Sequence, residues 1–274
     1  MKTFPNRGGG GATRSPRSWL FAPGNNEKLL RLVFDAGADV VLLDLEDAVP
    51  PDMKERAREM VGEVVASKQC WVRVNRARSE VCARDLEALA GSVLGLRIPK
   101  VDSAADVEWV AERAPGVPLD CTIESARGVL AAYEIASVPA CALLSYGGLD
   151  LTADLGIAAG EQETLYARSY LVTAARAAGK PSPSDGIHPL LQDDAGLRIE
   201  AESARRIGFF GKSAIHPRQV PIIHEVFAAT ADELEWARRV LAAFDAAGGA
   251  ATRTADGEFV DVPVAERARR ILQS

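Results

Sequence analysis

The stretch VVLLDLEDAVPP, residues 40–51, shows the pattern from which the fold can be inferred. Four aliphatic residues run without interruption, which is typical of a strand buried on both faces of a parallel sheet. Asp44, Glu46 and Asp47 then follow within four positions, and Pro50–Pro51 end the run. The pattern therefore predicts a core strand that delivers several negative charges to one place, and those charges need an explanation.

The same unit, a short apolar run followed by a longer amphipathic stretch, recurs along the chain. The runs that predict strands are 18–22, 39–45, 70–75, 95–101, 119–124, 140–148, 182–187 and 211–215. Strands that alternate with helices across short linkers predict a parallel sheet, and eight such units close into an α/β fold of the (β/α)8 TIM barrel type. An open doubly wound sheet is the alternative, but no glycine-rich dinucleotide loop follows the first strand.

The remaining segments predict an arm and an appended tail. Residues 1–16 contain a run of four glycines and indicate a flexible N-terminal arm before a catalytic barrel domain at 17–228. Residues 229–274 predict a helix, a hairpin with Asp256-Gly257 at its tip, and a last helix. We therefore expect a C-terminal helix–hairpin–helix extension that adds no strand to the barrel.

Composition excludes several classes of protein. The chain has 274 residues, 47% hydrophobic residues and a net charge of −6, which gives no electrostatic basis for binding nucleic acid or an acidic membrane. No apolar stretch approaches the roughly 20 residues of a membrane-spanning helix, and the N-terminus lacks the apolar region of a secretory signal. None of the four cysteines forms a CxxC pair. We expect a cytoplasmic protein.

Acidic and basic residues stand where the predicted strands end, which is where active sites of this fold form. Glu46 and Asp47 end the second strand, Arg73 lies in the third, Glu124 ends the fifth, and Asp150 follows the sixth. Carboxylates gathered at one rim repel one another unless a positive charge lies among them. Mg²⁺ prefers oxygen ligands, whereas the three histidines of the chain stand apart from these acids and make zinc a poor fit. The pattern predicts a hard divalent cation.

Each of these residues also has a purely structural explanation. Asp150 could cap the helix that follows it, and Glu46 or Asp47 could pair with Arg73. Ser125 is available to cap the helix after Glu124, so capping explains Glu124 least well.

Seven motifs, in order from about residue 17 to 260, resemble the HpcH/HpaI aldolase and citrate lyase family. The resemblance is strongest to the branch of the citrate lyase beta subunit, malyl-CoA lyase and citramalyl-CoA lyase. The motifs are RSWLFAPGN, DLEDAV, WVRVN, IPKV, TIESARG, YGGLDLTADLG and GFFGKSAIHPRQV.

The resemblance implies an oxo-acid-lyase that uses Mg²⁺, with Mn²⁺ as an alternative. Such an enzyme cleaves or forms a β-hydroxyacyl coenzyme A thioester such as malyl-, citramalyl- or citryl-CoA, giving an oxo acid and acetyl-CoA. Glu124 and Asp150 would be the metal ligands, and Glu46 and Asp47 would hold metal-bound waters. Arg73 would bind a carboxylate of the substrate and serve catalysis.

Further residues follow from the same resemblance. Gly147 and Gly148 would contact the substrate, and Lys100 is a candidate for phosphate contacts or for a structural pair. The residues expected near the CoA moiety are Arg17, Pro23, Gly24 and Asn25. Leu149 stands where members more often have a glutamate, so one acid is missing beside the metal.

The predicted C-terminal extension also resembles a part of these enzymes. EFVDVPVAERA resembles a segment that crosses to a neighbouring subunit in stand-alone CoA lyases and contributes a catalytic aspartate, here Asp261. This implies a homo-oligomer, a homotrimer or a multiple of it. Asp261 could instead only cap the last helix, before Pro263 in its first turn.

Two other functions remain as alternatives. One is a citrate lyase beta subunit that acts on a carrier-protein thioester within a complex. The other is a non-catalytic barrel that binds CoA or an oxo acid. A CoA-independent pyruvate aldolase is disfavoured because Asp47 stands where such enzymes place a histidine.

Overall fold

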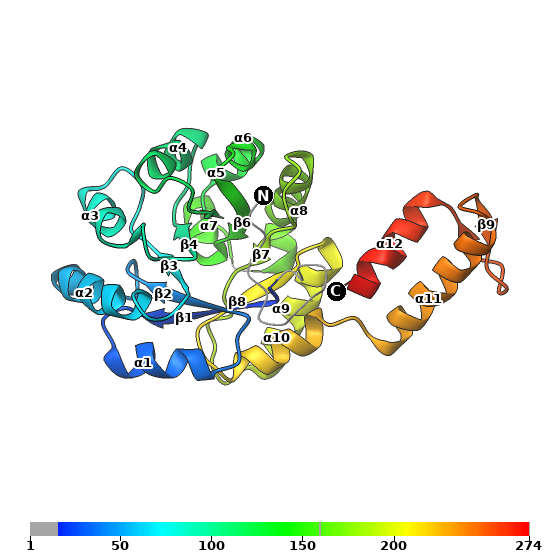
Figure 1. The fold of residues 1–274 in the computed structure, drawn as a ribbon, viewed down its shortest axis with the longest axis horizontal. Helices are drawn as coiled ribbons and strands as arrows, with labels where there is room; N and C mark the ends of the chain where they lie inside the picture. The colour runs from blue at the N-terminus through cyan, green and yellow to red at the C-terminus, as the bar shows by residue number, and fades with distance from the viewer. Residues whose placement is uncertain (1–15, 159, 274) are drawn as a thin grey trace. The chain divides into compact units, whose positions relative to one another are not determined.

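The computed structural model describes residues 16–158 and 160–273, which form two compact units, 16–227 and 228–273. The first unit is a closed barrel of parallel strands in sequence order, and β8 pairs with β1 to complete it. Figure 1 shows the strands surrounded by helices. The strands are β1 Ser18–Pro23, β2 Val40–Asp44, β3 Trp71–Arg73, β4 Gly95–Ile98, β5 Leu119–Ile123, β6 Cys141–Tyr146, β7 Ser184–Asp185 and β8 Gly211–Ala214. The predicted TIM barrel is confirmed.

Each strand lies within the range predicted for it, except that β1 extends one residue further, to Pro23. The shortest is β7, which has two residues and follows Pro183 directly. Proline has no N–H to donate to a sheet, so it limits how far this strand can pair. The expected N-terminal arm lies outside the described residues except for Pro16.

Helices follow the strands and cover the barrel. They are α1 Glu27–Leu32, α2 Lys54–Val65, α3 Glu80–Leu89, α4 Ala104–Arg113, α5 Ala126–Leu130, α6 Ala132–Ser137, α7 Gly148–Leu155, α8 Glu161–Ala177, α9 Asp194–Ile207 and α10 Gln219–Phe227, with short 3-10 helices at Val33–Asp35 and Pro51–Met53. Side-chain caps fix several starts: Asn26 accepts a hydrogen bond from the N–H of Leu29, and Ser79 accepts one from Cys82.

The barrel interior contains aromatic rings and a buried ion pair. Trp19 and Trp71 meet edge to face with their centroids 5.2 Å apart. Gly95 leaves room for this pair, since a Cβ there would lie 2.4 Å from the Trp71 ring. Arg97 donates from Nε to Asp120 Oδ2 at 2.6 Å, and its guanidinium lies 4.9 Å from the Trp19 ring. Charge inside the barrel is thus paired, as a buried charge must be.

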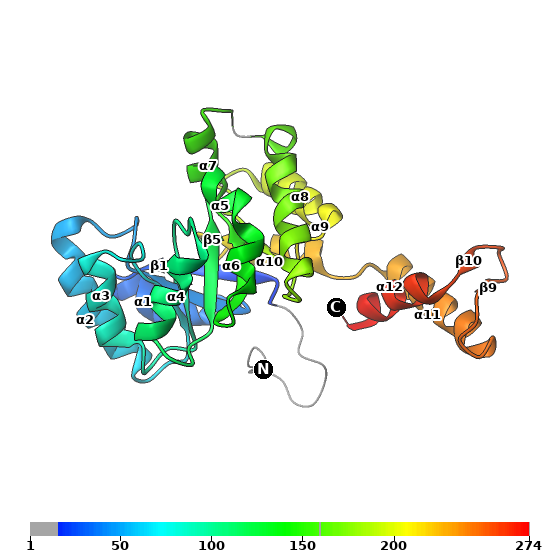
Figure 2. The same cartoon turned by 90° about the horizontal axis from the view of Figure 1, so that it is seen from above.

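The second unit is a helical hairpin with a small two-stranded sheet. It contains α11 Ala231–Ala246, β9 Thr252–Arg253, β10 Phe259–Val260 and α12 Val262–Gln273. Figure 2 shows α11 and α12 side by side, and a capping box of Thr230 and Glu233 starts α11. Its buried apolar residues are Ala237, Val240, Phe244, Val260, Ala265 and Ala268. The predicted helix–hairpin–helix extension is confirmed.

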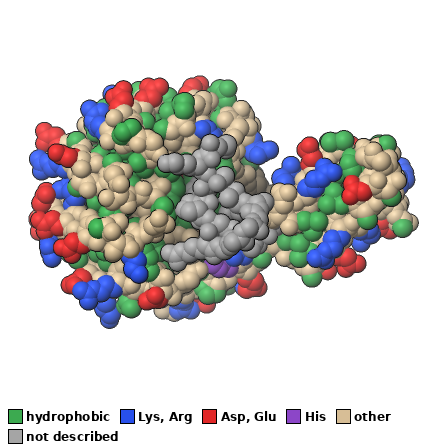
Figure 3. Space-filling model, viewed as in Figure 1, with side chains coloured by type: hydrophobic (Ala, Val, Ile, Leu, Met, Phe, Trp, Pro, Cys, Tyr) green, Lys and Arg blue, Asp and Glu red, His purple; other side chains and the backbone are tan. Residues whose placement is uncertain are grey.

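The surface of both units is mixed in charge. Figure 3 shows acidic and basic side chains interspersed over the visible face of each unit. Among the described residues, no helix is both long and apolar enough to cross a membrane.

Candidate active site

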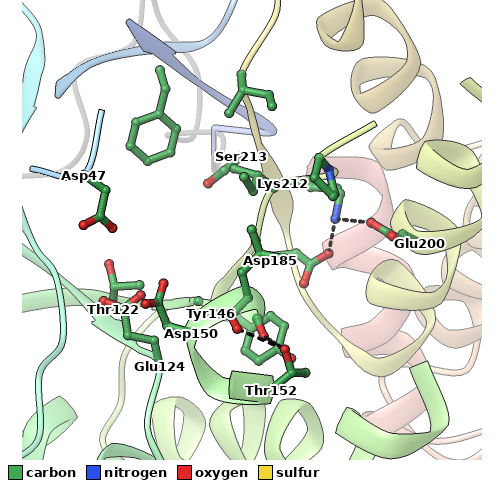
Figure 4. Close-up of a pocket in the computed structure, with 18 of the residues that line it drawn as sticks. Asp47, Thr122, Glu124, Tyr146, Asp150, Thr152, Asp185, Glu200, Lys212 and Ser213 are labelled. Atoms are coloured by element: carbon green, nitrogen blue, oxygen red, sulfur yellow. Dashed lines mark hydrogen bonds and ion pairs between the residues drawn. The ribbon is translucent and has the colours of Figure 1, made fainter. Parts of the chain in front are cut away.

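A cavity of about 600 Å³ lies where the barrel strands end. Figure 4 shows two groups of polar side chains around it, with Asp47, Glu124 and Asp150 in one group and Asp185, Glu200 and Lys212 in the other. The predicted site residues that line it are Pro23, Asp47, Arg73, Glu124, Gly147, Gly148 and Asp150. The barrel therefore brings most of the predicted site to one place.

Glu124 and Asp150 lie at the same end of the cavity (Figure 4). Ser125 caps α5 by accepting a hydrogen bond from Gly128, so Glu124 is not needed as a cap. Asp150 lies in the first turn of α7, whose N-cap position is occupied by Gly147 without a side-chain hydrogen bond. Burial, together with the nearby charge of Asp150, raises the pKa of Glu124 to about 7. The two carboxylates thus repel one another.

Gly147 leaves free the space that the Glu124 side chain occupies. A Cβ on Gly147 would lie 2.5 Å from both Cβ and Oε2 of Glu124. Its backbone φ of −108° is open to any residue, so the requirement for glycine is the space that Glu124 occupies. Gly147 N–H donates to the carbonyl of Ile123 at 3.0 Å, which ties β6 to β5 beside the acids.

Arg73 is held by one acid at the end of β2 and by another that follows this strand. Its Nε and Nη2 donate to the two carboxylate oxygens of Asp44, each at 2.7 Å, and its Nη1 lies 3.0 Å from Oε2 of Glu46. The structural pairing considered for Glu46 is therefore present. Arginine has five N–H donors, and the hydrogen bonds to Asp44 engage two of them, while the contact with Glu46 is an ion pair. Arg73 lines the cavity, and its three other N–H donors make no hydrogen bond among the described residues.

Lys100 supplies a positive charge among the acids. Its Nζ pairs with Oε1 of Glu46 and lies 3.2 Å from Asp47 and 3.9 Å from Asp150. Its backbone N–H donates to Oε1 of Glu124. Burial lowers the pKa of the ammonium, but the hydrogen bond to Glu46 and the neighbouring carboxylates together raise it above its usual range. The structural pair considered for Lys100 is therefore present, although nothing in its spacing along the chain relates it to β2.

The residue types here fit magnesium. Among the described residues, no group of three or more His, Cys, Asp or Glu side chains is arranged to hold a metal ion. Mg²⁺, however, is commonly bound through one or two carboxylates and keeps several waters. The Glu124–Asp150 pair is such a set, and a cation would relieve its repulsion. The buried hydroxyl of Thr122, which lines the cavity, has no hydrogen-bond partner among the described residues and could accept a bound water or ligand.

The other end of the cavity is an ion network between strands and helices. Lys212 Nζ lies 2.7 Å from Asp185 and 3.2 Å from Glu200 (Figure 4). Arg168 lies 3.6 Å from Asp185. Sequence reasoning did not select these residues. The available signal was a lysine in the middle of the short strand GKSA, because a charge in a barrel strand needs a partner.

The four residues expected near CoA do not lie together. Pro23, Gly24 and Asn25 are at the end of β1, whereas Arg17 stands before its start. Pro23 lines the cavity, and Gly24 N–H donates to the carbonyl oxygen of Asp44 at 2.8 Å. Arg17 precedes β1 and so lies at the opposite end of that strand. There its N–H donates to Asp39 at 2.7 Å, and its guanidinium donates to the carbonyl of His224 at 3.3 Å. The structure does not bring Arg17 to the cavity.

Asp261 belongs to the second unit, where it caps α12. Its Oδ1 accepts a hydrogen bond from Val264 N–H at 3.2 Å. The structural role considered for Asp261 is therefore present, and any catalytic role would come in addition to it.

Comparison with known proteins decides the family. The HpcH/HpaI aldolase/citrate lyase family matches residues 17–217. This chain belongs to that family. The (3S)-malyl-CoA thioesterase of Cereibacter sphaeroides is 38% identical over 256 residues, covering 89% of each chain. The citrate lyase subunit beta of Escherichia coli is 36% identical over 282 residues, covering 95% of this chain and 93% of its own.

A solved structure extends the similarity to three dimensions. Protein CitE from Mycobacterium tuberculosis, in complex with magnesium, acetoacetate and coenzyme A, superposes with a TM-score of 0.81 at 34% identity. The match covers 94% of this citrate lyase family chain and 97% of CitE. The family resemblance inferred from the motifs is confirmed.

Proposed function

We propose that this protein is a Mg²⁺-dependent carbon–carbon lyase that cleaves or forms a β-hydroxyacyl-CoA thioester such as malyl-, citramalyl- or citryl-CoA. The products of cleavage are an oxo acid and acetyl-CoA. The observation that carries the proposal is the pair Glu124 and Asp150 at one end of a cavity that Arg73 also lines. The magnesium, acetoacetate and coenzyme A bound to the related CitE support it.

Glu124 and Asp150 would hold the metal, Mg²⁺ or Mn²⁺, and Glu46 and Asp47 would hold water molecules bound to it. When present, the ion would act as a Lewis acid and as a template for the substrate. Lys100 already orients Glu46 and Asp47 toward this end of the cavity. The chain thus offers two direct ligands and two acids for an outer shell.

Arg73 would bind a carboxylate of the substrate. Asp44 fixes the guanidinium from one side, so its remaining N–H donors need no reorganisation when a carboxylate arrives. Gly147 and Gly148 would pack against the substrate without side chains in the way. The N–H of Gly148 lies in the first turn of α7, where a helix provides no internal acceptor.

Proton transfer completes the reaction. A base takes the proton of the β-hydroxyl, the C–C bond breaks, and its electron pair forms the enolate of acetyl-CoA. A proton delivered to that enolate gives acetyl-CoA. We assign this exchange to Asp261 of a neighbouring subunit in a homotrimer or a multiple of it, with Pro23, Gly24 and Asn25 near the thioester's CoA moiety. Arg17 is left out because it lies at the far end of β1.

The test is a panel of purified hydroxyacyl-CoA thioesters, assayed with and without Mg²⁺ for glyoxylate, pyruvate or oxaloacetate. We expect release of one oxo acid that depends on Mg²⁺. We also expect Glu124→Ala/Asp150→Ala to abolish Mg²⁺ binding in calorimetry, with Glu27→Ala/Asp52→Ala as a control of equal charge change outside the cavity. Retained binding in the first double variant would show that the ligands are different.

Two relatives favour specific alternatives that the same panel separates. The thioesterase relative favours hydrolysis, which would release free CoA and the intact hydroxy acid instead of an oxo acid. The citrate lyase beta subunit relative favours a carrier-protein thioester, and such an enzyme would be inactive on free CoA esters.

A further inference from the structure

Lys100 has a backbone conformation that lysine rarely adopts. Its φ is +52°, and Arg78 is the only other non-glycine residue with positive φ in the described part of the chain. Glycine enters this left-handed region without steric cost, whereas a residue with a Cβ is strained there. Such strain persists where the surroundings fix the residue, and it is concentrated at functional sites.

Contacts at both ends of the residue fix it. The backbone N–H of Lys100 donates to Glu124, which follows β5, and its ammonium pairs with Glu46, which follows β2. The left-handed turn thus allows one residue to contact acids from two strands, one through the main chain and the other through the side chain.

The ammonium also lies within ion-pair distance of Asp47, at 3.2 Å, and of Asp150, at 3.9 Å. Two other cations contact residues of this group: Arg73, which Asp44 already engages with both carboxylate oxygens, and Lys54, whose Nζ donates to the backbone carbonyl oxygen of Glu46 at 2.7 Å. Removing the Lys100 ammonium would therefore leave the acidic end one unit more negative, with no other positive group in contact with Asp47 or Asp150 among the described residues.

We infer that Lys100 is a resident counter-ion whose ammonium neutralises this acidic end until a divalent cation binds, so that metal binding has to overcome its positive charge. The inference rests on the proposed metal site. Like charges repel more strongly in a partly buried site than in water, so the ammonium weakens metal affinity while it stabilises the metal-free protein. Lys100 is a positioning residue for Glu46 and Asp47 and need not touch the substrate.

The test measures Mg²⁺ affinity by calorimetry on the full chain without thioester, and the melting temperature with and without Mg²⁺. We expect Lys100→Met to bind Mg²⁺ about tenfold more tightly than the unaltered protein. Its metal-free melting temperature should fall, and saturating Mg²⁺ should raise it by more than in the unaltered protein. Lys100→Arg should restore affinity to within about threefold because it keeps the charge.

Two further variants guard the interpretation. Lys100→Gly suits the left-handed backbone, so it should fold even where Lys100→Met does not, and it should bind Mg²⁺ more tightly as well. Lys180→Met is the matched control. Lys180 Nζ donates to the carbonyl oxygen of Cys141, the first residue of β6, at 2.6 Å and to that of Val138 at 3.3 Å, so it binds backbone and not the acids of the cavity. It should lower the melting temperature and leave the affinity unchanged.

Unchanged or weaker Mg²⁺ binding by Lys100→Met and Lys100→Gly would overturn the inference, since a merely structural lysine would give that result. Failure of the unaltered protein to bind Mg²⁺ would instead overturn the proposed metal site, and the inference with it. The two failures are therefore distinguishable.

Discussion

Gly147 shows how a single absent methyl group can position a functional carboxylate. Because a Cβ at this position would overlap Glu124 at 2.5 Å, any side chain would displace the carboxylate. The clash involves the Cβ of Glu124 as well as its flexible end, so it cannot be relieved by rotating the carboxylate alone.

We expect Gly147→Ala to weaken Mg²⁺ binding at least about tenfold. Displacing a metal ligand should cost the protein at least as much metal affinity as changing a residue that supports a ligand. Calorimetry measures this change in Mg²⁺ affinity. Gly62→Ala is the control: the nearest atom to its Cβ would be 3.8 Å away, and alanine in α2 should raise the free energy of unfolding by about 0.5–1 kcal/mol. Equal Mg²⁺ affinity of both variants would contradict this account.

The buried cysteines predict that the free energy of unfolding depends on pH. Burial raises the pKa values of the Cys70 and Cys82 thiols to about 12. The unfolded chain would release these protons near the ordinary thiol value, so the folded state binds more protons between the two values. The free energy of unfolding should therefore be unaffected by these thiols below about pH 8.5 and should fall as the pH rises from there toward 12.

Urea denaturation at pH 8 and pH 10 tests this expectation. The loss of stability between the two pH values should be smaller in Cys70→Ala than in the unaltered protein, although the variant is less stable at both. Both thiols should also resist a thiol reagent at pH 8 until the protein unfolds. Rapid labelling of the folded protein would contradict the assigned burial.

At the scale of elements, β4 and β5 are joined by the buried pair Arg97 and Asp120 as well as by their backbone. Asp120 also accepts a hydrogen bond from Ser145 in β6. Removing one member of a buried pair leaves the other charge without a partner, which costs more than removing both.

We expect Asp120→Ala to lower the free energy of unfolding by about 3–5 kcal/mol, and Arg97→Met/Asp120→Leu to cost clearly less than the sum of the single changes. A double-mutant cycle in urea measures this. Additive single effects would mean that the pair contributes no coupling.

The strands were predictable from sequence because barrel strands are apolar runs of limited length between turn signals. The end of the cavity around Glu124 and Asp150 was predictable for a related reason, since polar residues at such strand ends stand out. The network of Lys212, Asp185 and Glu200 was not, because it depends on which helix packs against which strand. A structural pair was one expectation for Lys100, but its partner Glu46 was not predictable, because the contact joins residues that follow different strands through a left-handed turn.

At the scale of the whole molecule, the second unit has a small core in which three of the six buried apolar residues are alanines. Segments of this size seldom bury enough apolar surface to be stable alone. Phe259 and Val262, which flank Asp261 closely, are more than half exposed. This combination supports the proposal that the unit docks on another subunit.

Asp261→Asn tests the role of Asp261 without removing its cap, because asparagine caps helices as well as aspartate does. We expect an unchanged melting temperature and a turnover lower by about 10²–10⁴-fold. Turnover within a few-fold of the unaltered protein would remove Asp261 from the mechanism.

Mixing tests whether the aspartate acts across subunits. Co-refolding Asp261→Asn chains with Glu124→Gln chains should restore about a quarter of full turnover, because random assortment in a closed ring leaves that share of sites complete. No restored activity would place Asp261 in the site of its own chain, or outside any site.

The brevity of β7 has a consequence for how this fold could change. β7 shares one paired position with β6 and two with β8, fewer than any other strand of the barrel, and Lys212 and Asp185 join it to its surroundings through side chains. An insertion beside β7 would thus disturb fewer sheet hydrogen bonds than one elsewhere around the barrel. This side of the cavity is therefore where its shape could change with the least disturbance of the barrel.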